Sequence, residues 1–156
     1  MQNNQNRTLH LIDIENLVGS PDPSARQVRQ VRDHYEPMYV RYGDQVVVAC
    51  SHHAFGSVAW EWPRARHVPR SGKDGADLAL LGVITGERVA ERFQHVMVAS
   101  GDAIFADAVA CLGMQGVNVT VIARHESFSR TLQLASRQHL LLPCLDASNA
   151  ELPESA

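Results

Sequence analysis

The sequence contains few cysteines and no long apolar run. Cys50, Cys111 and Cys144 are far apart and lack C-x-x-C spacing, which argues against a disulfide framework and a structural zinc site. We therefore predict buried free thiols in a reducing compartment. No apolar run approaches the ~20 residues of a membrane helix, and the polar start M-Q-N-N-Q-N-R is no secretory signal. These absences predict a cytoplasmic protein without membrane contact.

Lysine is almost absent, since Lys73 is the only one among fourteen basic side chains. The net charge of −3 excludes a strongly basic, histone-like polyanion binder, although the local field at a site matters more than the total charge. Of the 156 residues 45 % are apolar, which predicts one globular domain with a substantial core. We expect a flexible N-terminus over 1–7, the domain over 8–142 and a disordered tail over 143–156.

Short apolar segments alternate with amphipathic segments along the domain. Several apolar segments, such as V-V-V-A-C at 46–50, are continuous, which is typical of strands covered on both faces. This alternation predicts a parallel, doubly wound sheet between two layers of helices. The predicted strands are 8–14, 45–50, 65–69, 95–99, 117–122 and 139–142. The predicted helices are 24–36, 53–62, 74–85, 103–116 and 129–136.

Carboxylates gather where the predicted strands end. Asp13 lies within the apolar register of the first strand, and Asp77 and Asp102 open the helices after the third and fourth strands. Function in such folds gathers at the carboxyl ends of the strands. Carboxylates brought together need a counter-charge, and a hard divalent cation such as Mg²⁺ suits oxygen ligands and phosphates. We therefore predict a metal site that assists displacement at a phosphodiester.

Each acid also has a structural explanation. Asp102 suits a helix N-cap, and Asp77 suits the first turn of a helix, whereas Asp13 has no cap to make. Asp74 precedes Asp77 by about one helical turn and shares its face. Glu15 is predicted to point away from Asp13 and to be structural. Taken together, the three acids favour the metal site over three separate structural roles.

Basic and aromatic residues surround the third predicted strand. Arg70 and Lys73 flank the start of the following helix and are candidates to hold a phosphate; the alternative is a solvated loop. Trp60 and Trp62 precede a basic stretch at 64–70, a combination that suits single-stranded nucleic acid. The commoner explanation is that both tryptophans are core anchors, and we adopt it.

Three segments together resemble the NYN family of PIN-like ribonucleases. They are H-L-I-D-I-E-N-L at 10–17, G-K-D-G-A-D-L-A-L-L at 72–81 and V-A-S-G-D-A-I-F-A-D-A-V at 98–109. The resemblance implies a PIN-like three-layer α/β/α sandwich with an acidic, Mg²⁺- or Mn²⁺-dependent site that cleaves RNA. It extends over most of 8–142. The residues that match the family motifs are Asp13, Asn16, Asp77, Ser100 and Asp102.

The sequence also departs from the family pattern at two positions. Many relatives carry a further acid two residues after the aspartate of the S-G-D turn, where this chain has Ile104. A second acid of the central helix is replaced by Ile84. Asp74 and Asp107 are possible substitutes, although neither matches the pattern. Because of these departures, the sequence leaves open whether the site binds one or two metal ions and whether the protein is active.

Two functions of different classes remain as hypotheses. The favoured one is a metal-dependent endoribonuclease that leaves a 5′-phosphate and a 3′-hydroxyl. In it Asn16 and Ser100 orient the ligands, and the RNA backbone is held by Arg70, Lys73 and Arg130. The alternative is a PIN-like module that binds nucleic acid or a nucleotide without cleaving it. A phosphatase-like enzyme ranks lower because D-I-E-N lacks the D-x-D nucleophile pattern, and a homodimer through 53–62 is expected only by analogy of fold.

Overall fold

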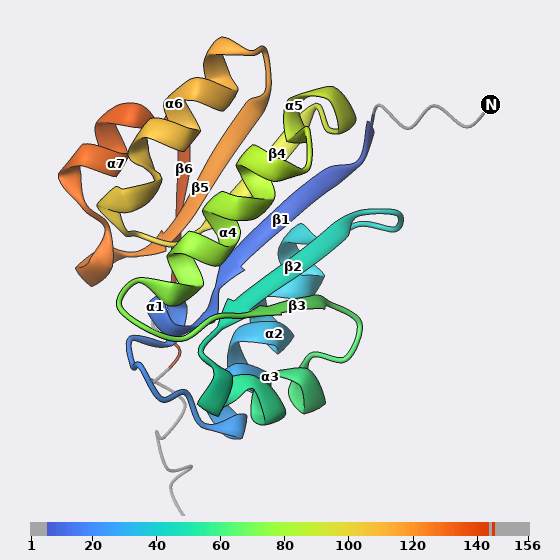
Figure 1. Ribbon diagram of the computed structural model, residues 1–156, viewed down its shortest axis with the longest axis vertical. Coiled ribbons are helices and arrows are strands. Elements are labelled where there is room, and N and C mark those ends of the chain that lie inside the picture. Colours follow the sequence, from blue (N-terminus) through green and yellow to red (C-terminus); the bar gives the residue numbers. More distant parts are fainter. Residues whose placement is uncertain (1–5, 144, 146–156) are drawn as a thin grey trace, which may run out of the picture.

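The computed structural model describes residues 6–143 and 145. Its centre is one six-stranded sheet in the order β3-β2-β1-β4-β5-β6, with every neighbouring pair parallel (Figure 1). The strands are β1 (Thr8–Asp13), β2 (Gln45–Cys50), β3 (Arg66–Pro69), β4 (His95–Ala99), β5 (Asn118–Arg124) and β6 (Gln138–Leu142). This confirms the predicted parallel, doubly wound sheet.

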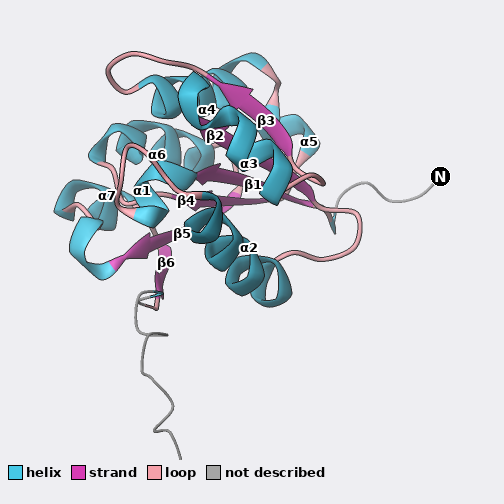
Figure 2. Ribbon diagram, turned by 90° about the horizontal axis from the view of Figure 1, so that it is seen from below, coloured by secondary structure: helices cyan, strands magenta, loops and turns pink. Residues whose placement is uncertain are grey.

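Helices cover both faces of the sheet and complete three layers (Figure 2). One face carries α1 (Ile14–Val18), α2 (Ala25–Tyr39) and α3 (Phe55–Glu61). The other carries α4 (Gly75–Gly86), α5 (Val89–Arg92), α6 (Ala106–Met114) and α7 (Arg130–Ala135). Three short 3-10 helices, η2 (His52–Ala54), η3 (Ala103–Phe105) and η4 (His125–Ser127), follow the carboxyl ends of β2, β4 and β5.

The continuous apolar runs supply two cores, one on each face of the sheet. In β1, Leu9 and Leu11 pack in the layer of α4–α7, whereas Ile12 packs in the layer of α1–α3, because alternate side chains of a strand point to opposite faces. Full burial of one such side chain stabilises the fold by about 1.5–3 kcal/mol. Burial on both faces explains why polar residues are rare in the central strands.

The predicted elements are all present, but several of their limits differ. The helices α1 and α5, each only one turn long, were not predicted from the sequence. The first strand ends at Asp13 instead of residue 14, because the chain turns directly into α1. The prediction that the first long helix ends before Pro37 is wrong, since α2 continues to Tyr39. A proline inside a helix removes one backbone hydrogen bond. The rings of Tyr35 and Tyr39, whose centroids are 5.0 Å apart, pack together and stabilise the turn that contains Pro37.

Two predictions about individual side chains are wrong. Trp62 is fully buried, and its Nε1–H donates to Glu36 Oε1 at 2.7 Å, but Trp60 is 83 % exposed. Residues two apart on a helix point in nearly opposite directions, so only one of the two anchors the core. Likewise Cys50 is buried and Cys111 is exposed, while Cys144 lies outside the described residues.

No helix in the described part of the chain combines the length and apolarity that a membrane span requires. The predicted flexible N-terminus and disordered tail fall largely outside residues 6–143 and 145, so these two predictions remain untested.

Candidate active site

The sheet order reverses between β1 and β4, its two central strands. A reversal of this kind leaves a crevice at the carboxyl ends of the two strands, where α/β proteins bind their ligands. Asp13 is the last residue of β1, and Asp102 begins the turn after β4. The fold therefore brings these two acids, which are far apart in the sequence, to the same edge of the sheet.

Asp13 is held in place by two hydrogen bonds and is only 4 % exposed. Its Oδ1 accepts from the Asn16 backbone N–H at 3.2 Å, and its Oδ2 accepts from the Ser100 Oγ–H at 3.1 Å. The first of these bonds caps α1, so the prediction that Asp13 makes no cap is wrong. One side chain thus both begins a helix and enters the crevice.

Asp77 lies in the first turn of α4, with its carboxyl group against that of Asp13. Asp77 is buried, and within the described residues its Oδ1 is the one buried side-chain nitrogen or oxygen that lacks a hydrogen bond. An unsatisfied buried polar atom costs about 1–3 kcal/mol, and more when it is charged. A partner for this oxygen therefore has to come from outside the described residues.

The loop between β3 and α4 turns sharply to deliver Asp77. Gly72 and Asp74 both have positive φ, +99° and +55°, and aspartate is one of the few non-glycine residues that tolerates this conformation. At Gly75 a Cβ atom would lie 2.4 Å from the carbonyl oxygen of Arg70, so only glycine fits. Backbone strain of this kind clusters at functional sites.

The two central carboxyl groups strongly affect each other's protonation. Burial raises the pKa of Asp77 to about 8, and the carboxylates of Asp13, Asp102 and Asp74 contribute to the increase. Burial also raises the pKa of Asp13, although its contacts with Asp77, Asn16 and Ser100 oppose the change. Two buried carboxyl groups in contact share a proton when no cation neutralises them.

Ser100 and Asn16 join the loops that carry the acids. The Ser100 Oγ accepts from the Asp102 N–H at 3.2 Å while it donates to Asp13. The Asn16 Oδ1 accepts from the Gly101 N–H at 2.9 Å and from the Ser127 Oγ–H at 3.3 Å. Ser100 is fully buried, so its contacts position the acids and do not reach the open cleft.

Asp102 caps η3, and its Oδ1 accepts from the Ile104 N–H at 2.9 Å. It lines the same open cleft as Asp13 and Asp77, which has a volume of about 430 Å³. Asp74 and Glu15 line this cleft too. The Glu15 Oε1 accepts from the Ser51 N–H after β2 at 3.0 Å, a bond that agrees with the structural role predicted for Glu15.

Arg124 brings positive charge to the cleft, and the sequence analysis missed it. Its Nε–H donates to the Asn16 carbonyl oxygen at 3.0 Å, and its guanidinium packs so closely on Gly19 that a Cβ there would lie 2.7 Å from Nη2. Arg124 is the last residue of β5. The acids were predicted because they follow the carboxyl ends of strands. The same reasoning would have identified Arg124 if the predicted strand had not ended at 122.

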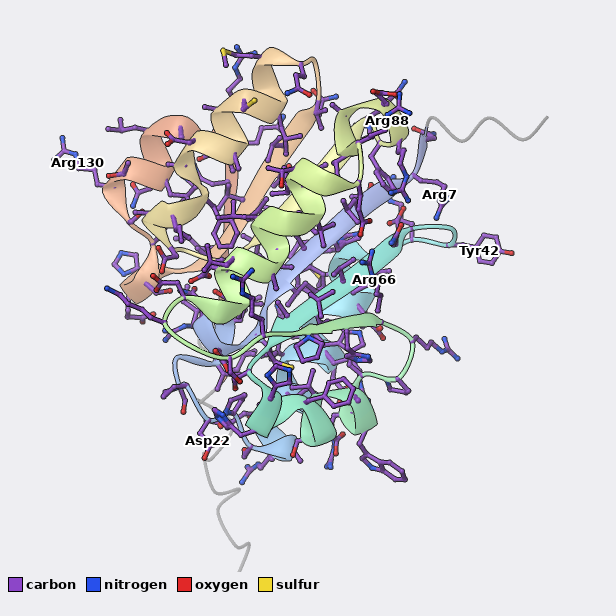
Figure 3. The ribbon with its side chains drawn as sticks, in the orientation of Figure 1. Arg7, Asp22, Tyr42, Arg66, Arg88 and Arg130 are labelled. Carbon is purple, nitrogen blue, oxygen red and sulfur yellow. The ribbon has the colours of Figure 1, made fainter. Side chains whose placement is uncertain are left out.

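Four further predicted residues are not among those that line the cleft. Arg70 and Lys73 are exposed on the loop before α4, and Asp107 is exposed on the first turn of α6. Arg130 projects outward from α7 at the left of Figure 3. The structure therefore gathers Asp13, Asp74, Asp77 and Asp102 at the cleft. Asp107 and the three predicted RNA-binding cations do not line it.

The carboxylate oxygens of the cleft suit a metal ion that makes few bonds to the protein. In the part of the chain that the structure describes, no group of three or more His, Cys, Asp or Glu side chains is arranged to hold a metal ion. Mg²⁺ is commonly bound through one or two carboxylates, with water and substrate oxygens as the other ligands. The pair of Asp13 and Asp77, with its unsatisfied oxygen, fits that kind of coordination.

The fold and the cleft define a three-layer α/β protein with an acidic site at its switch point. The crystal structure of a protein of unknown function from Vibrio parahaemolyticus has a similar fold, with a TM-score of 0.59 and 15 % sequence identity over 93 % of this chain and 98 % of that chain. No curated protein matches in sequence. The family model of the NYN domain matches residues 7–142.

The chain therefore belongs to the NYN domain family, which confirms the resemblance. Membership implies a PIN-like nuclease fold, and nucleases of this kind typically use divalent metal ions.

Proposed function

We propose that this protein is a metal-dependent endoribonuclease whose centre is the pair of Asp13 and Asp77. The observation that carries the proposal is the buried Asp77 Oδ1, which lacks a hydrogen bond beside a second buried carboxyl group. The arrangement costs stability and serves no packing role. It is accounted for if a cation, Mg²⁺ or Mn²⁺, binds there together with an RNA phosphate.

Asp13 and Asp77 would hold such an ion directly, and Asp102 through water. The chemistry that the ion supplies when bound is neutralisation of charge on the phosphate and activation of water. The reaction joins a water oxygen to phosphorus and breaks the bond to the 3′ oxygen, which takes up a proton. Ser100 and Asn16 fix the acids for this reaction, and Arg124 is placed to contact the phosphate.

The test is cleavage of an end-labelled, mixed-sequence RNA with Mn²⁺, with Mg²⁺ and with EDTA. We expect metal-dependent cleavage by the wild type and a loss of at least about a hundredfold in Asp13→Asn, on the scale of losing a main electrostatic catalytic group. Asp33→Asn is the matched control, because Asp33 is exposed on α2 and pairs with Arg32. Equal cleavage by Asp13→Asn and wild type would contradict the proposal.

A second candidate function, binding without cleavage, is favoured by Ile104. Where many relatives carry an acid, this half-buried side chain packs against the core of the α4–α7 layer. RNA binding by a folded protein that cleaves under none of the three conditions would favour this function. A homodimer stays a prediction; two side chains of the expected interface, Phe55 and Trp60, are exposed.

A further inference from the structure

A second cavity, larger than the acidic cleft, lies beside it on the α1–α3 face of the sheet. Its volume is about 570 Å³, and it opens between α1, α2 and the carboxyl ends of β5 and β6. Figure 2 shows α7 on one side of this end of the sheet and α2 on the other. Gln30 and Val31 of α2 and Leu141 and Leu142 of β6 line the same groove. We call this cavity the β6 groove.

The β6 groove has apolar walls and a few polar side chains. Leu17 and Leu142 line it but are only 2 % and 4 % exposed, whereas Val18 is half-buried and Leu141 and Pro143 are exposed. Apolar surface left open beside a polar cleft marks a binding site more often than a packing defect. The exposed apolar side chains of Leu141 and Pro143 suit a flat ligand that stacks on them.

Arg124 forms the partition between the two cavities, since its side chain lines both the β6 groove and the acidic cleft. Its contacts with Asn16 and Gly19 hold the guanidinium in this position. A ligand that occupies both cavities would therefore pass directly over a fixed positive charge. The charge complements a phosphate, which a guanidinium binds through paired N–H donors.

Four further polar side chains line the β6 groove, namely Gln27, Gln30, His125 and Glu126. Gln27 belongs to the capping box of α2, and the exposed Glu126 carboxylate lies 3.9 Å from Arg124 Nη1. Gln30 of α2 is half-buried, and its amide makes no hydrogen bond with the residues that the structure describes. It offers a donor and an acceptor together, as the edge of a nucleobase does. His125 is exposed at the rim, and an imidazole ring there can stack on a base.

We infer that the β6 groove binds one unpaired nucleobase of the RNA strand whose phosphodiester lies at Asp13 and Asp77. The inference rests on the proposed function and adds to it a site for one base next to the reacting phosphate. The base stacks on the apolar walls, its edge meets Gln30, and the phosphate next to it contacts Arg124. A base within a duplex has its edge occupied and cannot enter, so a duplex is a poor substrate.

The first experiment measures RNA binding without cleavage. Full-length protein in EDTA is titrated into a fluorescent single-stranded RNA of mixed sequence and into the matching duplex. We expect the single strand to bind at least tenfold more tightly than the duplex. Gln30→Ala should weaken binding of the single strand roughly tenfold, within the range for one stacked and read base. Gln94→Ala is the matched control, because Gln94 is exposed before β4, at the opposite end of the strands.

The second experiment locates the base. RNA with 4-thiouridine at each position in turn is cross-linked by light, and the modified peptides are identified by mass spectrometry. We expect cross-links within residues 17–18, 30–31, 124–126 or 141–143 from one position of the RNA. Removal of the base at that position should weaken binding by the wild type but have little further effect in Gln30→Ala.

These results separate the inference from the proposed function. RNA binding that depends on Gln30 without any cleavage would support the base site and contradict the nuclease. Cleavage that depends on Asp13, with equal binding by the Gln30 and Gln94 variants and cross-links elsewhere, would overturn the base site alone. The β6 groove would then belong to another occupant, such as residues 146–156 of this chain or a protein partner.

Discussion

The carboxyl group of Asp77 lies against that of Asp13, and its buried Oδ1 accepts no hydrogen bond from the part of the chain that the structure describes. The two side chains come from different layers of the sandwich, one from the end of β1 and one from the start of α4. Their proximity is a property of the fold and not of any local sequence motif.

This contact predicts that Asp77→Asn stabilises the metal-free protein at high pH. The pKa of Asp77 is raised to about 8 in the folded state and is near 4 in the unfolded state. Between these values the folded state holds a proton that the unfolded state releases, so stability falls as pH rises from about 4 to about 8. Urea unfolding in EDTA at pH 8.5 should show the variant more stable by about 1–3 kcal/mol.

The same measurement at pH 4 should show a much smaller difference, because the wild-type carboxyl group is then protonated. Asp33→Asn, on the exposed face of α2, should change neither value by more than about 0.5 kcal/mol. A variant that is less stable than wild type at pH 8.5 would contradict the repulsion between Asp13 and Asp77.

A divalent ion should reverse this instability in the wild type only. An ion that binds the folded state raises its stability by RT ln(1 + [L]/Kd), so Mn²⁺ at about one hundred times its Kd adds about 2.7 kcal/mol. We expect Mn²⁺ to raise the melting temperature of the wild type at pH 8, and EDTA to remove the increase. Asp77→Asn should show little increase; an equal increase in both proteins would place the ion elsewhere.

Gly101 should be as important to the site as the acids. A Cβ atom at this position would lie 2.1 Å from the Ser127 carbonyl oxygen, and the Gly101 N–H donates to Asn16. Gly101→Ala should therefore separate the two loops, destabilise the fold by about 2 kcal/mol or more and lower cleavage. Gly113→Ala is the control: no atom lies within 4 Å of a Cβ there, and alanine inside α6 should stabilise by about 0.5–1 kcal/mol.

A buried histidine near the opposite end of β1 predicts a separate pH effect on stability. The Tyr35 hydroxyl is 2.9 Å from His10 Nδ1, and Asp44 Oδ2 is 3.2 Å from Nε2. Burial lowers the pKa of His10 despite the nearby Asp44 carboxylate. The folded state thus resists a proton that the unfolded state takes up below about pH 6.5, and this contribution to stability is lost as pH falls.

His10→Gln should cost about 1–3 kcal/mol at pH 7.5, since it breaks buried hydrogen bonds. The cost should shrink at pH 5, where protonation of the unfolded state already penalises the wild type. Urea unfolding at both pH values measures the difference. A cost that stays constant would show that His10 does not titrate differently in the two states.

Much of the fold was predictable because the apolar runs and the helical periodicity are both strong. The sequence placed Asp13 and Asp102 at strand ends, and a parallel sheet must bring such ends to one edge. Arg124 was missed because the predicted strand ended two residues short of it. The cap that Asp13 makes was missed because the one-turn helix α1 was not predicted. The β6 groove was beyond prediction, because its lining comes from α1, α2 and the ends of β5 and β6, which only the folded chain brings together.

The residues that line the acidic cleft lie within 13–21 and 72–77 and at Asp102 and Arg124, which are four separate stretches of the chain. Contacts of such large sequence separation form late, because long loops must close before they gain any stabilisation. A nascent or partly folded chain consequently presents no pair of carboxylates. The proposed cleavage of RNA should therefore appear in a refolding sample only after the sheet is complete.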